Sequence, residues 1–193
     1  MSENKKNQKN FSSPYKDVRV IVLLSLLAAL SILCGKYLAF PGGGDSMIRF
    51  SFENLPILLA AMHVGPIAGM TVGILADLLG CLMVGYAINP IITLGAAAIG
   101  LLGGLIPRLL PKAWPRLLRI ALTVSAAHLI GSVVIKTFGL AQYYAMPFIV
   151  LMLWRLLNYA IISILECALL YLLGKNAAIA RQLRAFSKNS SLL

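Results

Sequence analysis

Residues 63–80 read HVGPIAGMTVGILADLLG and place Gly65, Gly69 and Gly73 four residues apart, followed by the charged Asp77. Residues at this spacing share one side of a helix, so the glycines form a strip that another helix can approach closely. Asp77 follows Gly73 by one turn and lies about 40° further around the helix, near the same groove. Small residues at intervals of four within apolar sequence are typical of helices that pack inside a membrane.

The rest of the chain has the same apolar character. Of its 193 residues, 60% are hydrophobic and 12% are charged, and the mean hydropathy is +0.87. Apolar runs of about 20 residues are long enough to cross a bilayer as helices. We predict an all-α integral membrane protein of six transmembrane helices, at about 18–38, 54–64, 66–85, 90–107, 116–138 and 148–173. The second is short, and because Gly65-Pro66 separates it from the third, the two could also form one bent segment.

The basic residues predict the orientation, because cytoplasmic loops are enriched in lysine and arginine. With six spans, 13 of the 17 basic residues lie on one side, which predicts that both termini are cytoplasmic. The 13 are Lys5, Lys6, Lys9, Lys16, Arg19, Arg108, Lys112, Arg116, Arg119, Lys175, Arg181, Arg184 and Lys188; the other four are Lys36, Arg49, Lys136 and Arg155.

The predicted organisation is a cytoplasmic tail (1–17), a six-helix membrane domain (18–174) and a basic cytoplasmic tail (175–193). The polar start is too long and too polar for a typical signal peptide, so we expect the first span to be retained. The net charge of +11 is spread over tails and one loop without interleaved aromatic residues. This pattern indicates contact with anionic lipid and not with nucleic acid.

The reactive residues do not form a familiar catalytic or metal-binding motif. Cys34, Cys81 and Cys167 are isolated in apolar sequence, and neither His63 nor His128 belongs to an HExxH motif. The absence of a Walker motif excludes a self-contained ATPase, and no metal or cofactor is expected. An integral membrane enzyme, such as a lipid-modifying transferase, is an alternative, but Asp77, Glu166 and His128 are too scattered in sequence to support it.

Polar and aromatic residues gather near the predicted outer surface. Singly they suit a membrane belt and snorkelling cations, whereas together they suit a planar heterocyclic ligand that carries carboxylates. A structural adaptor would need no such cluster. The alternating sequence MIRFSF, after Gly42, Gly43 and Gly44, predicts a short extended lid. The candidate ligand-binding residues are Arg49, Phe50, Glu53, Asn89, Lys136, Arg155 and Asn158.

The small-residue strip and Asp77 each have two interpretations. The strip serves packing within the bundle or offers a flat face to a partner subunit, and Ser25 and Ala29 repeat the spacing in the first helix. A charge at mid-membrane must be paired, so Asp77 is a structural anchor bonded to hydroxyls or backbone, or it belongs to a proton relay or a ligand site. We favour internal packing and the anchor.

Two segments, MIRFSFENLPILLAAMHVGPIAGMTVGILADLLG (47–80) and INPIITLGAAAIGLLGGL (88–105), resemble a known family. They look like the folate-family substrate-binding (S) component of energy-coupling-factor (ECF) vitamin transporters, over about residues 18–174. The chain departs from that family at Glu53, where a glycine or hydrophobic residue is usual. Glu53 is then either a local capping group or a sign that the ligand is not folate itself.

The resemblance implies a prokaryotic plasma-membrane protein that binds a vitamin tightly from outside, with folate or a reduced folate expected first and another vitamin as the alternative. It implies no enzymatic activity, because a transmembrane T component and two ATPase subunits would supply the energy. It also implies that small residues of the first three helices dock the T component. The docking candidates are Ala29, Gly65, Gly69 and Gly73.

Overall fold

The computed structural model describes residues 17–41 and 49–176, and nearly all of them are helical. The helices are α1 (Val18–Ile32), η2 (Leu33–Tyr37), α2 (Asn54–His63), α3 (Pro66–Val84), α4 (Pro90–Leu109), α5 (Arg116–Ala127), η3 (His128–Ile135), α6 (Lys136–Tyr144) and α7 (Phe148–Lys175). Within these ranges the strands are limited to β1 (Phe40–Pro41) and β2 (Arg49–Phe50), which pair antiparallel. The predicted all-α fold is therefore confirmed.

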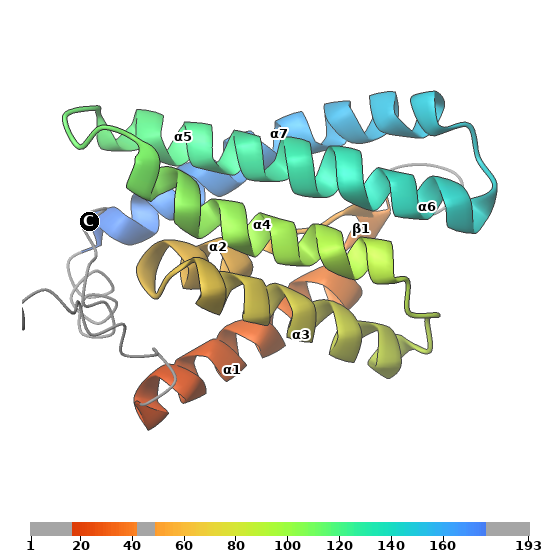
Figure 1. The fold of residues 1–193 in the computed structure, drawn as a ribbon, viewed down its shortest axis with the longest axis horizontal. Helices are drawn as coiled ribbons and strands as arrows, with labels where there is room; N and C mark the ends of the chain where they lie inside the picture. The colour runs from red at the N-terminus through yellow and green to blue at the C-terminus, as the bar shows by residue number, and fades with distance from the viewer. Residues whose placement is uncertain (1–16, 42–48, 177–193) are drawn as a thin grey trace, which may run out of the picture.

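The helices run back and forth between two ends of the bundle (Figure 1). The terminal end holds the start of α1, the α2–α3 turn, the α4–α5 connection and the end of α7; the strand end holds β1, β2 and the α3–α4 and α6–α7 connections. In the described residues, five helical stretches are long and apolar enough to cross a membrane. The 10 residues of α2 rise only about 15 Å, half the thickness of a hydrocarbon core.

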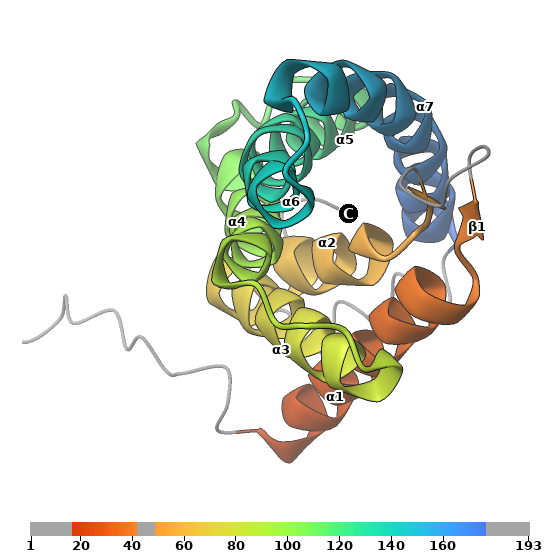
Figure 2. The ribbon, with the colours of Figure 1, turned by 90° about the vertical axis from the view of Figure 1, so that its right-hand side faces the viewer.

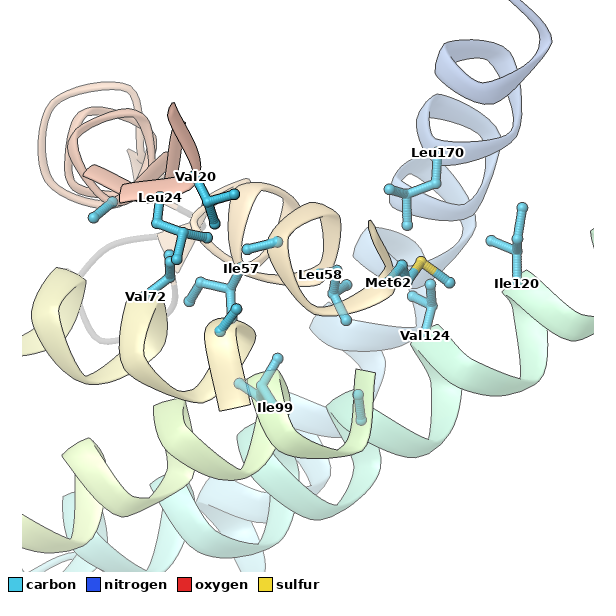
Figure 3. Packing of buried hydrophobic residues seen from close by; sticks show 14 residues of the cluster. Val20, Leu24, Ile57, Leu58, Met62, Val72, Ile99, Ile120, Val124 and Leu170 are labelled. Carbon is cyan, nitrogen blue, oxygen red and sulfur yellow. The ribbon is translucent and has the colours of Figure 1, made fainter. Parts of the chain in front are cut away.

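Helix α2 lies inside a ring formed by the other helices (Figure 2), and most of its residues are buried. Ile57, Leu58 and Met62 project from it into the main hydrophobic core (Figure 3). Side chains from α1, α3, α4, α5 and α7 surround them, including Leu24, Val72, Ile99, Val124 and Leu170. Because protein surrounds it on every side, α2 is stabilised by packing and does not need the length of a full span.

Gly65 separates α2 from α3, as the sequence suggests. Its φ of 143° lies in a region that L side chains rarely adopt, and Pro66 then starts α3 at a position where a missing N–H costs nothing. The two segments are thus separate helices and do not form one bent helix.

The glycine strip of α3 packs inside the bundle, mainly against α4. A Cβ added at Gly69 would overlap Ala61 and the carbonyl oxygen of Gly100, and one added at Gly73 would overlap the carbonyl oxygen of Ala96. Both glycines are buried, so neither offers a surface to another subunit in this arrangement. Gly69 and Gly73 therefore serve packing within the bundle, which is the interpretation that we favour.

The other two docking candidates, Gly65 and Ala29, lie away from the contacts that Gly69 and Gly73 make. Gly65 is at the terminal end beside Arg108, whose Nη2 would lie 3.0 Å from an added Cβ. Ala29 is exposed on the outer side of α1, together with Ser25 and the apolar Val22, Leu26 and Leu33.

The fifth predicted helix is longer than expected. Helical structure continues without a break from Arg116 through η3 and α6 to Tyr144, so the predicted end at 138 was wrong. Gly139 does not interrupt it, and the stop comes at Ala145, which has a left-handed conformation with a φ of 51° before Met146-Pro147. Lys136, expected at the end of this helix, therefore lies well inside it.

Candidate functional site

An ion pair between Glu53 and Lys136 joins the start of α2 to the start of α6. Lys136 Nζ donates to Glu53 Oε1 at 2.8 Å, and the lysine side chain is 6% exposed. Two glycines make room for the pair: an added Cβ would lie 2.7 Å from Glu53 Oε2 at Gly35 and 2.5 Å from Lys136 Cγ at Gly95. The backbone of Glu53 is also held in place, because its carbonyl accepts a hydrogen bond from the Ser31 hydroxyl of α1 at 2.6 Å.

The structure tests whether Glu53 is a local capping group, one of the two interpretations given above. Glu53 precedes the first turn of α2, but its side chain makes no capping hydrogen bond there. Its carboxylate instead reaches Lys136, 83 residues later in the chain. The local-cap interpretation is therefore wrong, and Glu53 belongs to the charged interior of the strand end.

A small cavity adjoins the ion pair. Its volume is about 20 Å³, enough for a water molecule but far too little for a vitamin. It is lined by Ser31, Ile32, Gly35, Lys36, Glu53, Ile57, Gly73, Ala76, Asp77, Ala96 and Lys136. Charged groups from η2, α3, α6 and the residue before α2 thus line one small cavity, and a vitamin could occupy it only if these elements moved apart.

Asp77 lines the same cavity and is anchored by a hydroxyl. The Thr93 hydroxyl of α4 donates to Asp77 Oδ2 at 2.6 Å, and its Oγ1 also lies 3.3 Å from the carbonyl oxygen of Asn89. This is the bond to a neighbouring helix that the anchor interpretation predicts.

Arg155, Asn158 and Tyr159 share the inward side of α7, as their spacing predicts. Arg155 is partly exposed, whereas Asn158 and Tyr159 are 5% and 8% exposed. Trp154 turns outward and is 57% exposed, which suits a membrane belt. Arg155 Nε and Nη2 donate to the Ser132 carbonyl at 3.3 and 3.0 Å. Because Ser132 precedes Lys136 by about one helical turn, Arg155 is bonded to the backbone one turn away from the lysine on the same continuous helix.

The strand β2 brings Phe50 to this site. Phe50 packs against a buried cluster of Val133, Tyr159 and Ile162, which joins η3 to α7. Arg49 lies opposite Pro41 in the antiparallel pairing. The extended conformation predicted for MIRFSF is confirmed at Arg49 and Phe50. The Arg49 side chain and the predicted lid glycines, Gly42 to Gly44, lie outside what the structure describes.

Asn89 caps α4, which is one of its two predicted roles. Its Oδ1 accepts the Ile91 N–H at 3.0 Å, and its Nδ2 donates to the Gly139 carbonyl of α6 at 3.0 Å. Both groups of the amide are thus engaged with backbone, so in this arrangement Asn89 supports the rim of the site and holds α4 to α6.

Sequence reasoning missed a buried network between η3 and α7. His128 Nε2 lies 2.6 Å from Glu166 Oε2, and His128 Nδ1 lies 3.3 Å from Ser132 Oγ. Helix packing joins His128 and Glu166 although they are 38 positions apart, whereas Asp77 bonds Thr93 instead, so the three residues do not form a catalytic group. The order Ser–His–Glu is that of a hydrolase triad, but all three are at most 1% exposed, so no substrate can reach the serine.

Comparisons with known proteins give the family. The sequence model of the family described as ECF transporter, substrate-specific component, matches residues 19–174. A search of curated proteins gave no match. A solved structure described as FolT bound with folic acid is similar with a TM-score of 0.69 and 19% identity, covering 83% of this chain and 95% of that one.

A second solved structure, described as the S component of a bacterial ECF transporter, has a TM-score of 0.59 and 20% identity, covering 81% of this chain and 96% of that one. At these identities the similarity shows a shared fold, and the family match covers the whole helical body from α1 to α7. The chain belongs to the family of substrate-specific components of ECF transporters.

Proposed function

We propose that this chain is a high-affinity vitamin-binding S component whose ligand is folate or a reduced folate. The observation that carries the proposal is a pair of cations: buried Lys136 lines the cavity, and the Arg155 guanidinium donates to the Ser132 carbonyl, about one helical turn before Lys136. Folate carries a planar pterin and a glutamate with two carboxylates, and its carboxylates suit lysine and arginine. The similar fold of FolT bound with folic acid supports the same ligand class.

Family membership excludes an enzymatic role and gives the cellular location. Substrate-specific components are transport subunits, so the chain is not an enzyme. Together with its long apolar helices, membership makes it a multi-pass protein of the plasma membrane.

The Glu53–Lys136 pair suggests how the ligand would enter. A ligand carboxylate would replace Glu53 on Lys136, and the released Glu53 carboxylate would accept the adjacent donors of the pterin ring. Phe50 offers aromatic surface near the arginine, because it packs against Tyr159, whose ring centroid lies 5.2 Å from the Arg155 guanidinium. Since the cavity is about 20 Å³, this exchange requires the strand end to open before the ligand can bind.

Titration calorimetry with purified protein tests the ligand assignment. We expect folic acid or a reduced folate to bind with a Kd in the nanomolar range, and thiamine, riboflavin and biotin not to bind. Protein that binds none of the folates but binds another vitamin would contradict the folate assignment while leaving the S-component role intact.

The ion pair also favours a second candidate ligand. Because Glu53 already neutralises Lys136, the site could suit a vitamin or precursor with fewer carboxylates than folate. The same titration, extended to such compounds, separates the two candidates.

We propose that the strand end faces the exterior and that both termini are cytoplasmic. Among the described residues, the terminal end carries Arg19, Arg108, Lys112, Arg116, Arg119 and Lys175, which follows the bias of cytoplasmic loops. Lys112 and Gln142 are exposed near opposite ends. In a cysteine-free background, an impermeant thiol reagent on intact cells should label Gln142→Cys and spare Lys112→Cys. Labelling of both from outside would contradict this orientation.

The proposed partners are a T component and two ATPase subunits, and the exposed side of α1 is the surface that we assign to the T component. Ala29 and Ser25 leave a flat strip there, bordered by exposed apolar side chains such as Leu26. A bulky residue on this strip should block close helix approach without reaching the ligand site.

Ala29→Trp is expected to abolish ATP-dependent uptake, and recovery of the T component with the tagged protein, while changing ligand affinity less than twofold. Ile164→Trp is the matched control, because Ile164 is 71% exposed on α7, away from this strip. Normal uptake by Ala29→Trp would show that the T component docks elsewhere.

A further inference from the structure

The guanidinium of Arg155 is held by the protein on one side. Nε and Nη2 both donate to the Ser132 carbonyl, and Nη2 lies 3.4 Å from the Tyr159 hydroxyl. Nη1 makes no hydrogen bond within the described part of the chain. Both N–H groups of Nη2 thus have acceptors, so Nη1 is the part of Arg155 that is left to donate to a carboxylate, and its direction depends on Ser132 and Tyr159.

Tyr159 links this guanidinium to the core of the bundle. The Arg155 guanidinium lies 5.2 Å from the centroid of the Tyr159 ring, and the His128 ring stacks on the same tyrosine at 5.1 Å with an interplanar angle of 28°. Contacts of both kinds have preferred geometries, so the tyrosine ring can shift only if its neighbours shift with it.

Glu166 and Ser132 fix the histidine in turn. His128 Nε2 lies 2.6 Å from Glu166 Oε2, and His128 Nδ1 lies 3.3 Å from Ser132 Oγ. Ser132 therefore contacts both residues, since its carbonyl also accepts from Arg155. Ser132 belongs to η3, a π-helical segment; such segments are rare and are found frequently at functional sites.

Burial separates this network from direct ligand contact. Ser132, His128 and Glu166 are at most 1% exposed, and one oxygen of Glu166, Oε1, has no hydrogen-bond partner. A buried histidine–carboxyl hydrogen bond that leaves one oxygen unsatisfied is a poor source of stability, because burying an unpaired polar atom costs free energy. A role in holding one arrangement of side chains accounts better for its presence.

We propose that Glu166, His128 and Tyr159 are positioning residues that set the direction of the Arg155 guanidinium and so determine affinity for the ligand's carboxylate. The proposal rests on the proposed function, in which Arg155 binds that carboxylate. None of the three residues needs to touch the ligand: each acts through the next, from Glu166 to His128, then Tyr159, then Arg155.

A double-mutant cycle on the full-length protein, with folic acid as the ligand, tests the proposal. Glu166→Gln keeps the shape of the side chain and weakens its hold on His128, and Tyr159→Phe keeps the ring and removes the hydroxyl beside Arg155. Each change is expected to weaken folic acid binding about tenfold in the wild-type background. In an Arg155→Gln background each is expected to change affinity less than twofold, because the group that it positions is gone.

The outcomes are distinct. If either variant weakens binding equally in both backgrounds, or if neither weakens binding in the wild-type background, the positioning role is wrong. If Glu166→Gln does not fold, Tyr159→Phe alone decides the result by the same criteria. A wild-type protein that binds no folic acid overturns the proposed function and this inference together, whereas folic acid binding without coupling overturns this inference alone.

Discussion

Arg155→Gln is expected to weaken folic acid binding about 100-fold, equivalent to ~2.7 kcal/mol, because it removes a charged donor from the ligand carboxylate. The uncharged fragment 6-hydroxymethylpterin should lose less than threefold, since it has no carboxylate for Arg155 to bind. Calorimetry with the two ligands gives both numbers. Arg108→Gln is the matched control, because Arg108 is an exposed arginine at the terminal end.

Equal losses for the two ligands would contradict the role of Arg155 as the carboxylate-binding group. Lys136 needs a different design, because Lys136→Gln alone would leave the Glu53 carboxylate without its partner. The double variant Glu53→Gln, Lys136→Gln removes both charges at once. It should retain the fold and still bind folic acid more weakly than the wild-type protein.

Gly100→Ala is expected to destabilise the protein by about 3 kcal/mol or more, although it adds one methyl group. The added Cβ would overlap the backbone of Gly69, and neither α3 nor α4 can yield without separating along the glycine strip. In detergent, the thermal midpoint should fall by about 10 °C, measured by the loss of monodisperse protein on heating.

Gly80→Ala is the matched control for this change. Gly80 lies on α3, and its added Cβ would lie 2.9 Å from Lys36 Cε, in a flexible side chain that can move away. We expect a shift in the midpoint of less than 3 °C. If Gly100→Ala is equally mild, α3 and α4 are not packed as closely as described.

The helices were predictable because each is encoded by local sequence. Apolar runs of span length, Pro at the first position of α3 and α4, and Gly65 before Pro66 define most of the boundaries. The end of α6 was not predictable in this way, since no strong breaker precedes Ala145 and a single glycine is tolerated within a packed helix.

The partners within the site were not predictable, because they are set by packing between distant segments. The spacing of Arg155, Asn158 and Tyr159 gave a shared side of α7 correctly. No spacing rule joins Glu53 to Lys136 or His128 to Glu166, which meet through the packing of different helices. The one available sign was the presence of glutamates in apolar sequence, which must find partners when they are buried.

Mass spectrometry of the small molecule that co-purifies with the full-length protein, extracted gently from cells that synthesise folates, tests the central claim most directly. The account predicts a pterin-containing compound with one or more glutamates, present in wild-type protein and strongly reduced in Arg155→Gln. Recovery of a different vitamin, held equally well by both proteins, would contradict it.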